Sequence, residues 1–368
     1  MKVIIVGGGI IGLLTAKELL QNGVLVTILE RGEFGKEASW AGGGIVSPLY
    51  PWTYSNPITA LASWSQSYYP KLVEELRSKT RIDPQLNPSG LLMLDPPDIE
   101  QALEWASFHG KGVSCLNVSN ALELEPNVNF HTNQNLLFPY VGNVRNPRLL
   151  KSLISYLESH SNCDLIPYAR VDGFEQRSEH VAVFGKEIHL AEKVILCSGA
   201  WTSDLLQMAN IASSVTIEPV KGQMILFEPR PGLINSIVLR GGKYLIPRLD
   251  GHIVAGSTLE YQGFDKESTE QAKSLLLSSA YDMVPELKNA KVEAHWAGLR
   301  PGTAAGVPYI GKMPGWDNLY LNAGHFRNGL VLAPASARLM SNLILQQKPI
   351  IDPSPYDPAR ARILEPMH

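Results

Sequence analysis

The first chemistry that the sequence offers is the binding of a dinucleotide. Gly7, Gly9 and Gly12 form a G-x-G-x-x-G pattern directly after the apolar run at residues 3–6. In a strand-to-helix turn of this kind, the first glycine permits the sharp turn and the second lets backbone approach a pyrophosphate. The third lets the helix pack closely on the sheet. The pattern therefore predicts a phosphate site.

The neighbouring residues support this interpretation. Ile10 and Ile11 begin an apolar repeat with helical spacing that continues to residue 20, so the helix start would face the phosphates. A second apolar strand at residues 24–29 ends on Glu30, whose carboxylate could accept hydrogen bonds from a ribose, and Arg31 follows. A turn without a phosphate is the alternative. NAD(P) and FAD both stay open, although Glu30 disfavours the 2′-phosphate of NADP.

Two later segments also predict a close approach of backbone to a ligand. Small residues gather at 38–44, where they leave room for a flat ligand and supply donors, with a flexible surface loop as the alternative. The buried strand at 193–197 runs into a Ser-Gly-Ala turn at the carboxyl end of a sheet, where open α/β sheets bind ligands. The residues concerned are Ser39, Trp40, Gly42, Gly43 and Gly44, then Ser198, Gly199 and Trp201.

Length and composition limit the class of protein. A chain of 368 residues is too long for one ordinary core, which predicts two domains. A net charge of −3 gives no reason to expect nucleic acid or an anionic membrane as a partner. The three cysteines are far apart and show no metal-ligand spacing, which predicts idle, reduced thiols and no metal site. Neither a signal peptide nor a membrane span is predicted, so we expect a cytoplasmic protein.

The elements that must position these residues follow from periodicity. Helical spacing and strand-like runs alternate tightly at first and more loosely from about residue 85, where a second domain is expected to begin. Residues 296–303 are predicted to be rich in turns and residues 349–358 irregular. Helices are predicted at 57–78, 98–108, 119–124, 147–160, 270–283 and 330–346, and strands at 90–94, 164–167, 171–184, 193–197, 223–227, 237–239, 243–248, 252–256 and 318–322.

Taken in order, these motifs resemble the D-amino-acid oxidase family of FAD-dependent oxidoreductases over essentially the whole chain. The resemblance implies an α/β fold, in which a Rossmann-like FAD-binding domain is interleaved with a substrate domain built on an antiparallel sheet. The FAD-binding domain would comprise residues 1–85, 145–220 and 296–368, and the substrate domain residues 86–144 and 221–295. The marks of the family are residues 3–12 with Glu30, and residues 38–44, 194–205, 297–303 and 323–334.

The resemblance also implies how FAD is held. The three motif glycines would bind the pyrophosphate, Glu30 the adenosine ribose, and the backbone of Val171 the adenine. The helix near Gly329 would point its N-terminus at the flavin pyrimidine. FAD should be non-covalent, because members with covalent flavin use a late cysteine and none follows Cys197. The expected set is Gly7, Gly9, Ile10, Ile11, Gly12, Glu30, Arg31, Ser39, Trp40, Gly42, Gly43, Gly44, Val171, Ser198, Gly199, Trp201, Arg300, Phe326, Arg327, Asn328, Gly329 and Leu330.

Three residues are implied at the substrate. An amino-acid carboxylate needs a fixed cation, and the planar fork of arginine binds both oxygens at once. Arg300 matches the family's carboxylate-binding arginine, Tyr244 a tyrosine over the flavin, and Arg327 a site position of the glycine-oxidising members. The alternatives are a surface ion pair for Arg300, a core role for Tyr244 and a structural role for Arg327. His325 is left outside the catalytic set.

The reaction implied by the resemblance is the oxidation of glycine, and of small amines such as sarcosine and D-alanine, to the oxo acid, ammonia and hydrogen peroxide. Dioxygen would be the acceptor, and the product would serve thiamin biosynthesis. A homo-oligomer such as a tetramer is expected. Gly242 and Leu259 replace larger or different residues of some relatives, which leaves the preference among these amines open. A D-amino-acid dehydrogenase that reduces a quinone is the first alternative, and a non-catalytic flavoprotein is the second.

Overall fold

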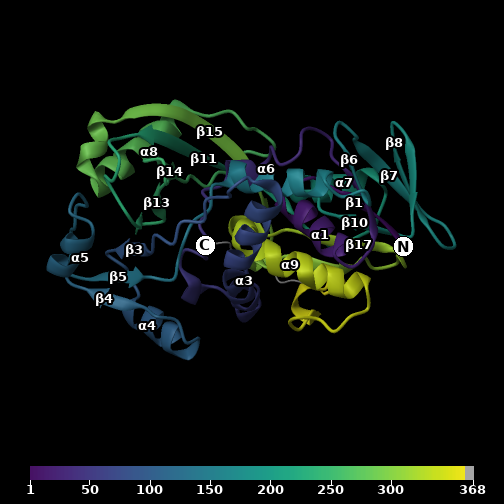
Figure 1. The fold of residues 1–368 in the computed structure, drawn as a ribbon, viewed down its shortest axis with the longest axis horizontal. Coiled ribbons are helices and arrows are strands. Elements are labelled where there is room, and N and C mark those ends of the chain that lie inside the picture. Colours follow the sequence, from purple (N-terminus) through teal and green to yellow (C-terminus); the bar gives the residue numbers. More distant parts are fainter. Residues whose placement is uncertain (361–368) are drawn as a thin grey trace.

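The computed structural model describes residues 1–360 and has two main sheets at opposite ends of the molecule (Figure 1). The first sheet has six strands in the order β16-β17-β10-β1-β2-β6. Five of them are parallel and the edge strand β16 is antiparallel to β17. Its β1-α1-β2 unit is the strand, helix and strand that the first thirty residues predict. Its strands are β1 (Lys2–Val6), β2 (Leu25–Leu29), β6 (Cys163–Ile166), β10 (Lys193–Leu196), β16 (Tyr309–Lys312) and β17 (Leu319–Ala323).

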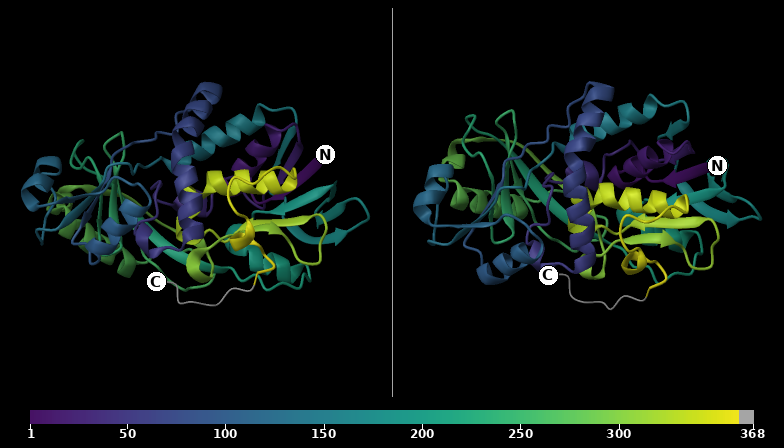
Figure 2. Two further views of the ribbon diagram at one scale, coloured as in Figure 1. Left: turned by 90° about the horizontal axis from the view of Figure 1, so that it is seen from below. Right: turned by 60° about the horizontal axis from the view of Figure 1, so that its bottom comes forward.

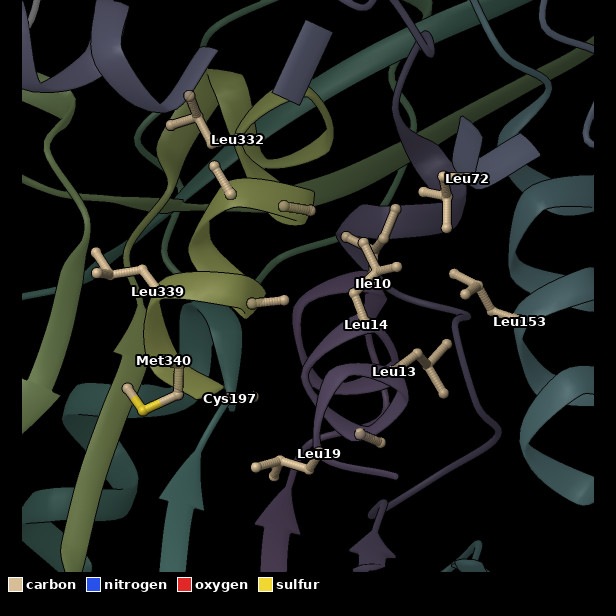
Figure 3. Close-up of a cluster of buried hydrophobic side chains, with 14 of the residues drawn as sticks. Ile10, Leu13, Leu14, Leu19, Leu72, Leu153, Cys197, Leu332, Leu339 and Met340 are labelled. Carbon is tan, nitrogen blue, oxygen red and sulfur yellow. The ribbon is translucent and has the colours of Figure 1, made fainter. Parts of the chain in front are cut away.

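Helix α1 (Ile10–Leu20) lies at the centre of the largest core. It is apolar on nearly every side, as expected of a helix that is covered all round rather than on one face. Figure 3 shows its leucines facing Leu72, Leu153 and the C-terminal helix. Helix α3 lies between the two sheets and packs on α9 and α6 (Figure 2). The covering helices are α3 (Asn56–Thr80), α6 (Asn146–Glu158) and α9 (Gly329–Ile344).

The other face of the six-stranded sheet carries a separate apolar core. A three-stranded antiparallel sheet and one short helix cover this face, which fits the right-hand side of Figure 1. The dinucleotide motif is therefore held in a sheet that is buried on both faces, as parallel sheets generally are. The covering elements are β7 (Val171–Gln176), β8 (Val181–Gly185), β9 (Ile188–Ala191) and α7 (Thr202–Met208).

The second large sheet has eight strands in the order β15-β11-β14-β13-β12-β3-β5-β4. Every neighbouring pair is antiparallel except β12 and β3, which are parallel. Helix α8 packs on one face of this sheet. The strands are β3 (Leu91–Leu94), β4 (Ser114–Leu116), β5 (Asn135–Phe138), β11 (Glu218–Glu228), β12 (Ile237–Arg240), β13 (Lys243–Pro247), β14 (Ile253–Gly256) and β15 (Lys291–Gly302), and the helices of this half are α4 (Ile99–Phe108), α5 (Val118–Leu124) and α8 (Glu270–Met283).

The prediction of turns at residues 296–303 is wrong. These residues are the second half of β15, which pairs with β11 in continuous register from residue 294 to residue 302. Gly298, Pro301 and Gly302 disfavour a strand locally, but β15 lies at the sheet edge, where proline is tolerated because one side needs no ladder hydrogen bonds. Strands β4, β5, β9 and β16 are also absent from the prediction.

The remaining features of the described chain are brief. One short helix, α2 (Ala38–Ala41), follows the dinucleotide unit. All three cysteines are free thiols. Within residues 1–360, no helix is long and apolar enough to cross a membrane, and no three metal-ligating side chains of His, Cys, Asp or Glu gather at one point. The 3-10 helices are Pro51–Thr53, Gly199–Trp201, Pro285–Asn289, Ala304–Gly306, Phe326–Asn328 and Ser354–Tyr356.

Candidate functional site

A cavity of about 750 Å³ is lined by residues of both sheets. At one end it is lined by the carboxyl ends of β1, β2 and β10, which is where open α/β sheets bind their ligands. At the other end it reaches the face of the eight-stranded sheet at Tyr244 and Arg300. The cavity therefore has a dinucleotide end, a middle part and a substrate end, and these names are used below.

The phosphate turn has the geometry that its glycines predict. Gly7 has a φ of +114°, and a Cβ built on it would lie 2.3 Å from the backbone oxygen of Cys197. Gly9 caps α1 and contacts the cavity. A Cβ on Gly12 would lie 2.0 Å from the backbone oxygen of Gly7, so this glycine packs the helix against the turn and does not line the cavity. Gly7 and Gly12 are therefore required for close packing of the turn, and Gly9 leaves its side of the turn open toward a ligand.

Glu30 is fixed at the end of β2. The amide of Gly8 donates to its Oε2 at 2.7 Å, and the amide of Gly32 donates to its Oε1 at 2.9 Å. The carboxylate also lines the cavity, so its remaining lone pairs can accept hydrogen bonds from a ribose. An oriented acid at this place is the second part of a dinucleotide site.

An aromatic and charged cluster lies beside the dinucleotide end, and we call it the clasp: Phe264 and Lys266 with Trp201 and Glu37, of which the last two line the cavity. The ring of Phe264 stacks on Trp201 with centroids 5.6 Å apart, and Lys266 Nζ lies 3.1 Å from Oε1 of Glu37. On the Trp201 ring, the Arg31 guanidinium carbon lies 3.5 Å from the centroid. The loop between β14 and α8 thus reaches from the eight-stranded sheet to the cofactor end of the cavity.

The middle of the cavity contains polar atoms without partners. Nδ2 of Asn328 and Oδ1 of Asn146 are buried and make no hydrogen bond within the described chain. Nδ2 of Asn146 donates to the backbone oxygens of Ser39 and Gly42 at 2.8 and 3.0 Å, which holds the small-residue segment in place. Because buried polar groups are nearly always paired, the free donor and free acceptor indicate a polar ligand here.

The substrate end presents a fixed cation. Nη2 of Arg300 donates to Oγ of Ser257 at 2.7 Å, and Nη1 donates to the backbone oxygens of Thr258 at 3.2 Å and Lys221 at 3.4 Å. No carboxylate of the described residues lies within ion-pair distance of it, which excludes the surface ion pair. Burial lowers the pKa of Arg300, and the nearby Tyr244 opposes that shift.

Two further cations lie near Arg300. Arg327 lines the cavity, and Lys243 donates to the backbone oxygen of Ser257 at 3.0 Å. Burial lowers the pKa of Lys243, and the charges of Arg327 and Arg300 lower it further. The acids that line the cavity, Glu30, Glu37 and Asp204, all lie outside this end. Glu260 acts on Arg300 electrostatically but does not line the cavity, so positive charge is in excess on the wall at this end, which suits an anionic substrate.

His325 belongs to a buried polar chain. Its Nε2 lies 2.7 Å from Oγ of Ser336, and that hydroxyl donates to Oδ1 of Asn322 at 2.6 Å. Since the hydroxyl proton goes to Asn322, Nε2 of His325 must carry the proton of its own hydrogen bond. Burial lowers the pKa of His325 to about 3, so the imidazole is neutral.

Comparison with known proteins decides the family. Residues 2–343 match the family model described as FAD dependent oxidoreductase. The chain belongs to this FAD-dependent oxidoreductase family. It is 47% identical over 361 residues to a glycine oxidase of Pseudomonas aeruginosa, an alignment that covers 97% of this chain and 98% of that one.

Two further family relatives add detail. The chain is 31% identical to the bifunctional protein ThiO/ThiG of Synechocystis, and the match covers 94% of this chain but 52% of the longer relative. The crystal structure of glycine oxidase from Geobacillus kaustophilus superposes with a TM-score of 0.93 at 30% identity, and the match covers 98% of each chain. The α/β fold with a Rossmann-like domain and an antiparallel substrate sheet is therefore confirmed.

The residues of this family member fit FAD. The phosphate turn has no side chain at Gly9, Glu30 is oriented for a ribose, and the middle of the cavity offers a free amide N–H and a free carbonyl. Helix α9 begins at Gly329 on the cavity wall, so its N-terminal partial positive charge faces the same space. FAD as cofactor agrees with each of these features.

Nearly all the predicted site residues meet in one cavity. Arg300, Tyr244 and Arg327 line it, and so does the expected cofactor set apart from Gly12 and Trp40. Trp40 is 38% exposed and packs edge-on against Trp296, so its place in the cofactor set is not supported by the cavity. Sequence reasoning missed Asn146 and Ser257. Only their spatial neighbours identify them, although Asn146 directly precedes the helix predicted at 147–160.

Proposed function

We propose that this protein catalyses the FAD-dependent oxidative deamination of glycine, and of sarcosine and D-alanine, to the oxo acid, ammonia and hydrogen peroxide. The observation that carries the proposal is the fixed, unpaired Arg300 at the substrate end of the cavity, in a chain 47% identical to a glycine oxidase over nearly its full length. A small amino acid offers one carboxylate to this arginine and brings its Cα toward the middle of the cavity.

In the proposal, the protein mainly binds and orients the substrate. Arg300 binds the substrate carboxylate through its planar fork, and the hydroxyl of Tyr244 supports the same group. Bound FAD would supply the redox chemistry by accepting a hydride from the substrate Cα and passing electrons to dioxygen. Asn328 and the N-terminus of α9 would hold the flavin pyrimidine, and Asn146 would fix the loop beside it.

The described residues offer no convenient general base at the substrate end. The lining carboxylates lie elsewhere, and burial lowers the pKa of His325 to about 3, which makes its imidazole a weak base. This supports direct transfer of hydride from a substrate whose amine is neutral. The amine must then lose its proton before or during binding.

The same proposal includes the cofactor set of the sequence analysis, with Asn146 added and Gly12 and Trp40 given packing roles. It also includes the interleaved domains: residues 1–85, 145–220 and 296–368 for FAD, and 86–144 and 221–295 for substrate. Residues 361–368 lie outside the described chain, and the boundary at 295/296 falls within β15. A cytoplasmic homo-oligomer that supplies thiamin biosynthesis completes the proposal, and the match to the ThiO half of ThiO/ThiG relatives supports the last point.

An anaerobic titration tests this proposal. The purified yellow holoenzyme is titrated with glycine, sarcosine and D-alanine under nitrogen, and air is then admitted while peroxide is measured. We expect glycine to bleach the flavin absorbance and air to restore it with formation of peroxide. Bleaching that only a quinone reverses would favour the D-amino-acid dehydrogenase. A flavin that none of the three amines bleaches would refute the proposed substrates.

A further inference from the structure

Two glycines face each other in the middle of the longest strand pair. Gly222 of β11 is the register partner of Gly298 of β15, and residues directly opposite each other in an antiparallel pair project to the same face of the sheet. Glycine weakens a strand interior and commonly marks a close approach of another group. The backbone conformation does not require glycine at position 222, because its φ is not positive and the register shift of this ladder lies at Leu226 and Phe227.

The group that approaches Gly222 is the Arg300 guanidinium. A Cβ built on Gly222 would lie 2.2 Å from Nη1, 2.3 Å from Nη2 and 2.4 Å from Cζ of Arg300. Arg300 pairs with Val220, two residues from Gly222 on the same face, so its side chain runs diagonally across the sheet. The guanidinium therefore lies on the backbone of β11, in the space that any other residue at position 222 would fill.

This position makes the hydrogen bonds of Arg300 possible. Flat on the sheet, the guanidinium reaches the backbone oxygens of Lys221 and Thr258 and the hydroxyl of Ser257. These contacts engage both Nη atoms and hold the guanidinium at the cavity wall, which Arg300 lines. A methyl group at position 222 would lift the guanidinium off these partners.

Gly298 serves a different neighbour. A Cβ built on it would lie 2.4 Å from Cβ of Ala41, and Nε1 of Trp296 donates to the backbone oxygen of Ala41 at 3.0 Å. The small-residue loop beside the proposed flavin thus rests on Gly298. Within this pair, Gly222 on β11 leaves space for the guanidinium of Arg300, and Gly298 on β15 leaves space for Ala41 of the small-residue segment.

We propose that Gly222 is a positioning residue for the substrate: by lacking a side chain, it lets Arg300 lie flat on β11 with its fork directed at the substrate carboxylate. The proposal rests on the proposed function only in that Arg300 receives a carboxylate. Because the atoms that a new Cβ would meet belong to the end of a flexible side chain, Gly222→Ala should move Arg300 and keep the fold.

The test measures carboxylate binding to the holoenzyme. Acetate is titrated into wild type, Gly222→Ala and the matched control Gly173→Ala, while flavin absorbance or heat is recorded. Gly173 lies in β7, and a Cβ there would meet only a ring atom of Phe184 at 3.9 Å. We expect Gly222→Ala to weaken acetate binding and to raise KM for glycine about tenfold to a hundredfold, since charge-assisted hydrogen bonds are lost. Flavin content and Tm should stay near those of Gly173→Ala.

A double-mutant cycle separates positioning from general damage. In an Arg300→Ala background, Gly222→Ala should have no further effect on acetate affinity, because the side chain it displaces is gone. An unchanged acetate Kd in Gly222→Ala, or an equal loss in both backgrounds, would overturn the proposal. If the single variant fails to fold, Gly222→Ala/Arg300→Ala should fold, and its failure would also overturn it.

The outcomes that would refute glycine oxidation differ from those that would refute the role of Gly222. A wild-type enzyme that binds acetate but does not oxidise glycine refutes glycine oxidation, and the acetate cycle still tests Gly222. A wild-type enzyme that does not bind acetate overturns the role of Gly222, because Arg300 would then receive no carboxylate.

Discussion

Replacing Arg300 by alanine should reduce substrate affinity strongly while changing stability little. The guanidinium is a cation whose hydrogen-bond partners are the hydroxyl of Ser257 and two backbone oxygens, that of Thr258 and, at the edge of hydrogen-bond range, that of Lys221. Its charge is not balanced by any carboxylate in ion-pair contact within residues 1–360. The positive charge of Arg300 therefore has no anionic partner in the described chain, and we expect a substrate carboxylate to be that partner.

The magnitude follows from the bonds that are lost. A carboxylate held by both arms of the fork makes two charge-assisted hydrogen bonds, each worth about 1.5–3 kcal/mol. Competition with water at the cavity reduces the sum, so we expect a loss of roughly 3 kcal/mol, about a hundredfold in affinity. For the fold, the lost hydrogen bonds are offset by removal of a desolvated charge, and the net change in the free energy of unfolding should stay within about 2 kcal/mol.

The assay compares Arg300→Ala and Arg300→Lys by oxygen consumption with glycine. KM should rise about a hundredfold in the alanine variant. The KM of the lysine variant should lie between those of wild type and the alanine variant, because lysine keeps the charge but not the planar fork. Urea unfolding and flavin content serve as controls. An unchanged KM with glycine, or a variant that loses flavin and stability together, would refute the reasoning and give Arg300 a structural role.

Four further results are expected. Gly7→Ala should lose FAD affinity and destabilise the protein by about 1–3 kcal/mol, because its Cβ would meet the Cys197 backbone at positive φ; equilibrium dialysis with FAD and urea unfolding measure both. Phe264→Ala with Lys266→Met should open the clasp and speed FAD release roughly 5- to 30-fold by loss of one ring stack and one surface ion pair, and a release rate equal to wild type would show that the clasp does not retain FAD. Because burial lowers the pKa of His325 to about 3, the unfolded chain binds the extra proton first as pH falls below about 6.5; stability should therefore decrease with acid by up to about 1.4 kcal/mol per pH unit, and His325→Asn should flatten this slope in urea titrations between pH 6 and 4. Finally, kcat/KM for glycine should rise with pH as the substrate amine deprotonates, and a pH-independent kcat/KM would contradict hydride transfer from the neutral amine.

The clasp and the Arg300 site share one loop. Ser257 and Thr258, at the start of this loop, hold Arg300, and Phe264 and Lys266, further along, contact the cofactor end of the cavity. The substrate end and the dinucleotide end are thus assembled partly from the same segment of chain. If the clasp retains FAD as predicted, the substrate half of the chain would contribute to cofactor binding through this loop.

Elements made of neighbouring residues could be predicted from the sequence alone. The strand, glycine turn, helix and acid between residues 2 and 30 are contiguous, and their periodicity and turn chemistry act within a few residues of each other. The same holds for α8, whose predicted and observed bounds agree, and for α3, which differs by one or two residues at each end. The family motifs also led to Arg300, Tyr244 and Arg327 as site residues, and all three line the cavity.

Only the tertiary structure decided the elements whose stability comes from distant partners. Residues 296–302 have the composition of a turn but form a strand, because β11 supplies eleven paired positions along β15. Asn146 and Ser257 join the site through contacts with residues about a hundred and about forty positions away, which no local pattern encodes. The role proposed for Gly222 also depends on a distant residue. The sequence shows only a glycine within a strand, and the folded chain places the guanidinium of Arg300 against it. Local sequence fixes backbone preference, whereas the packing of side chains from separate segments decides which atoms meet.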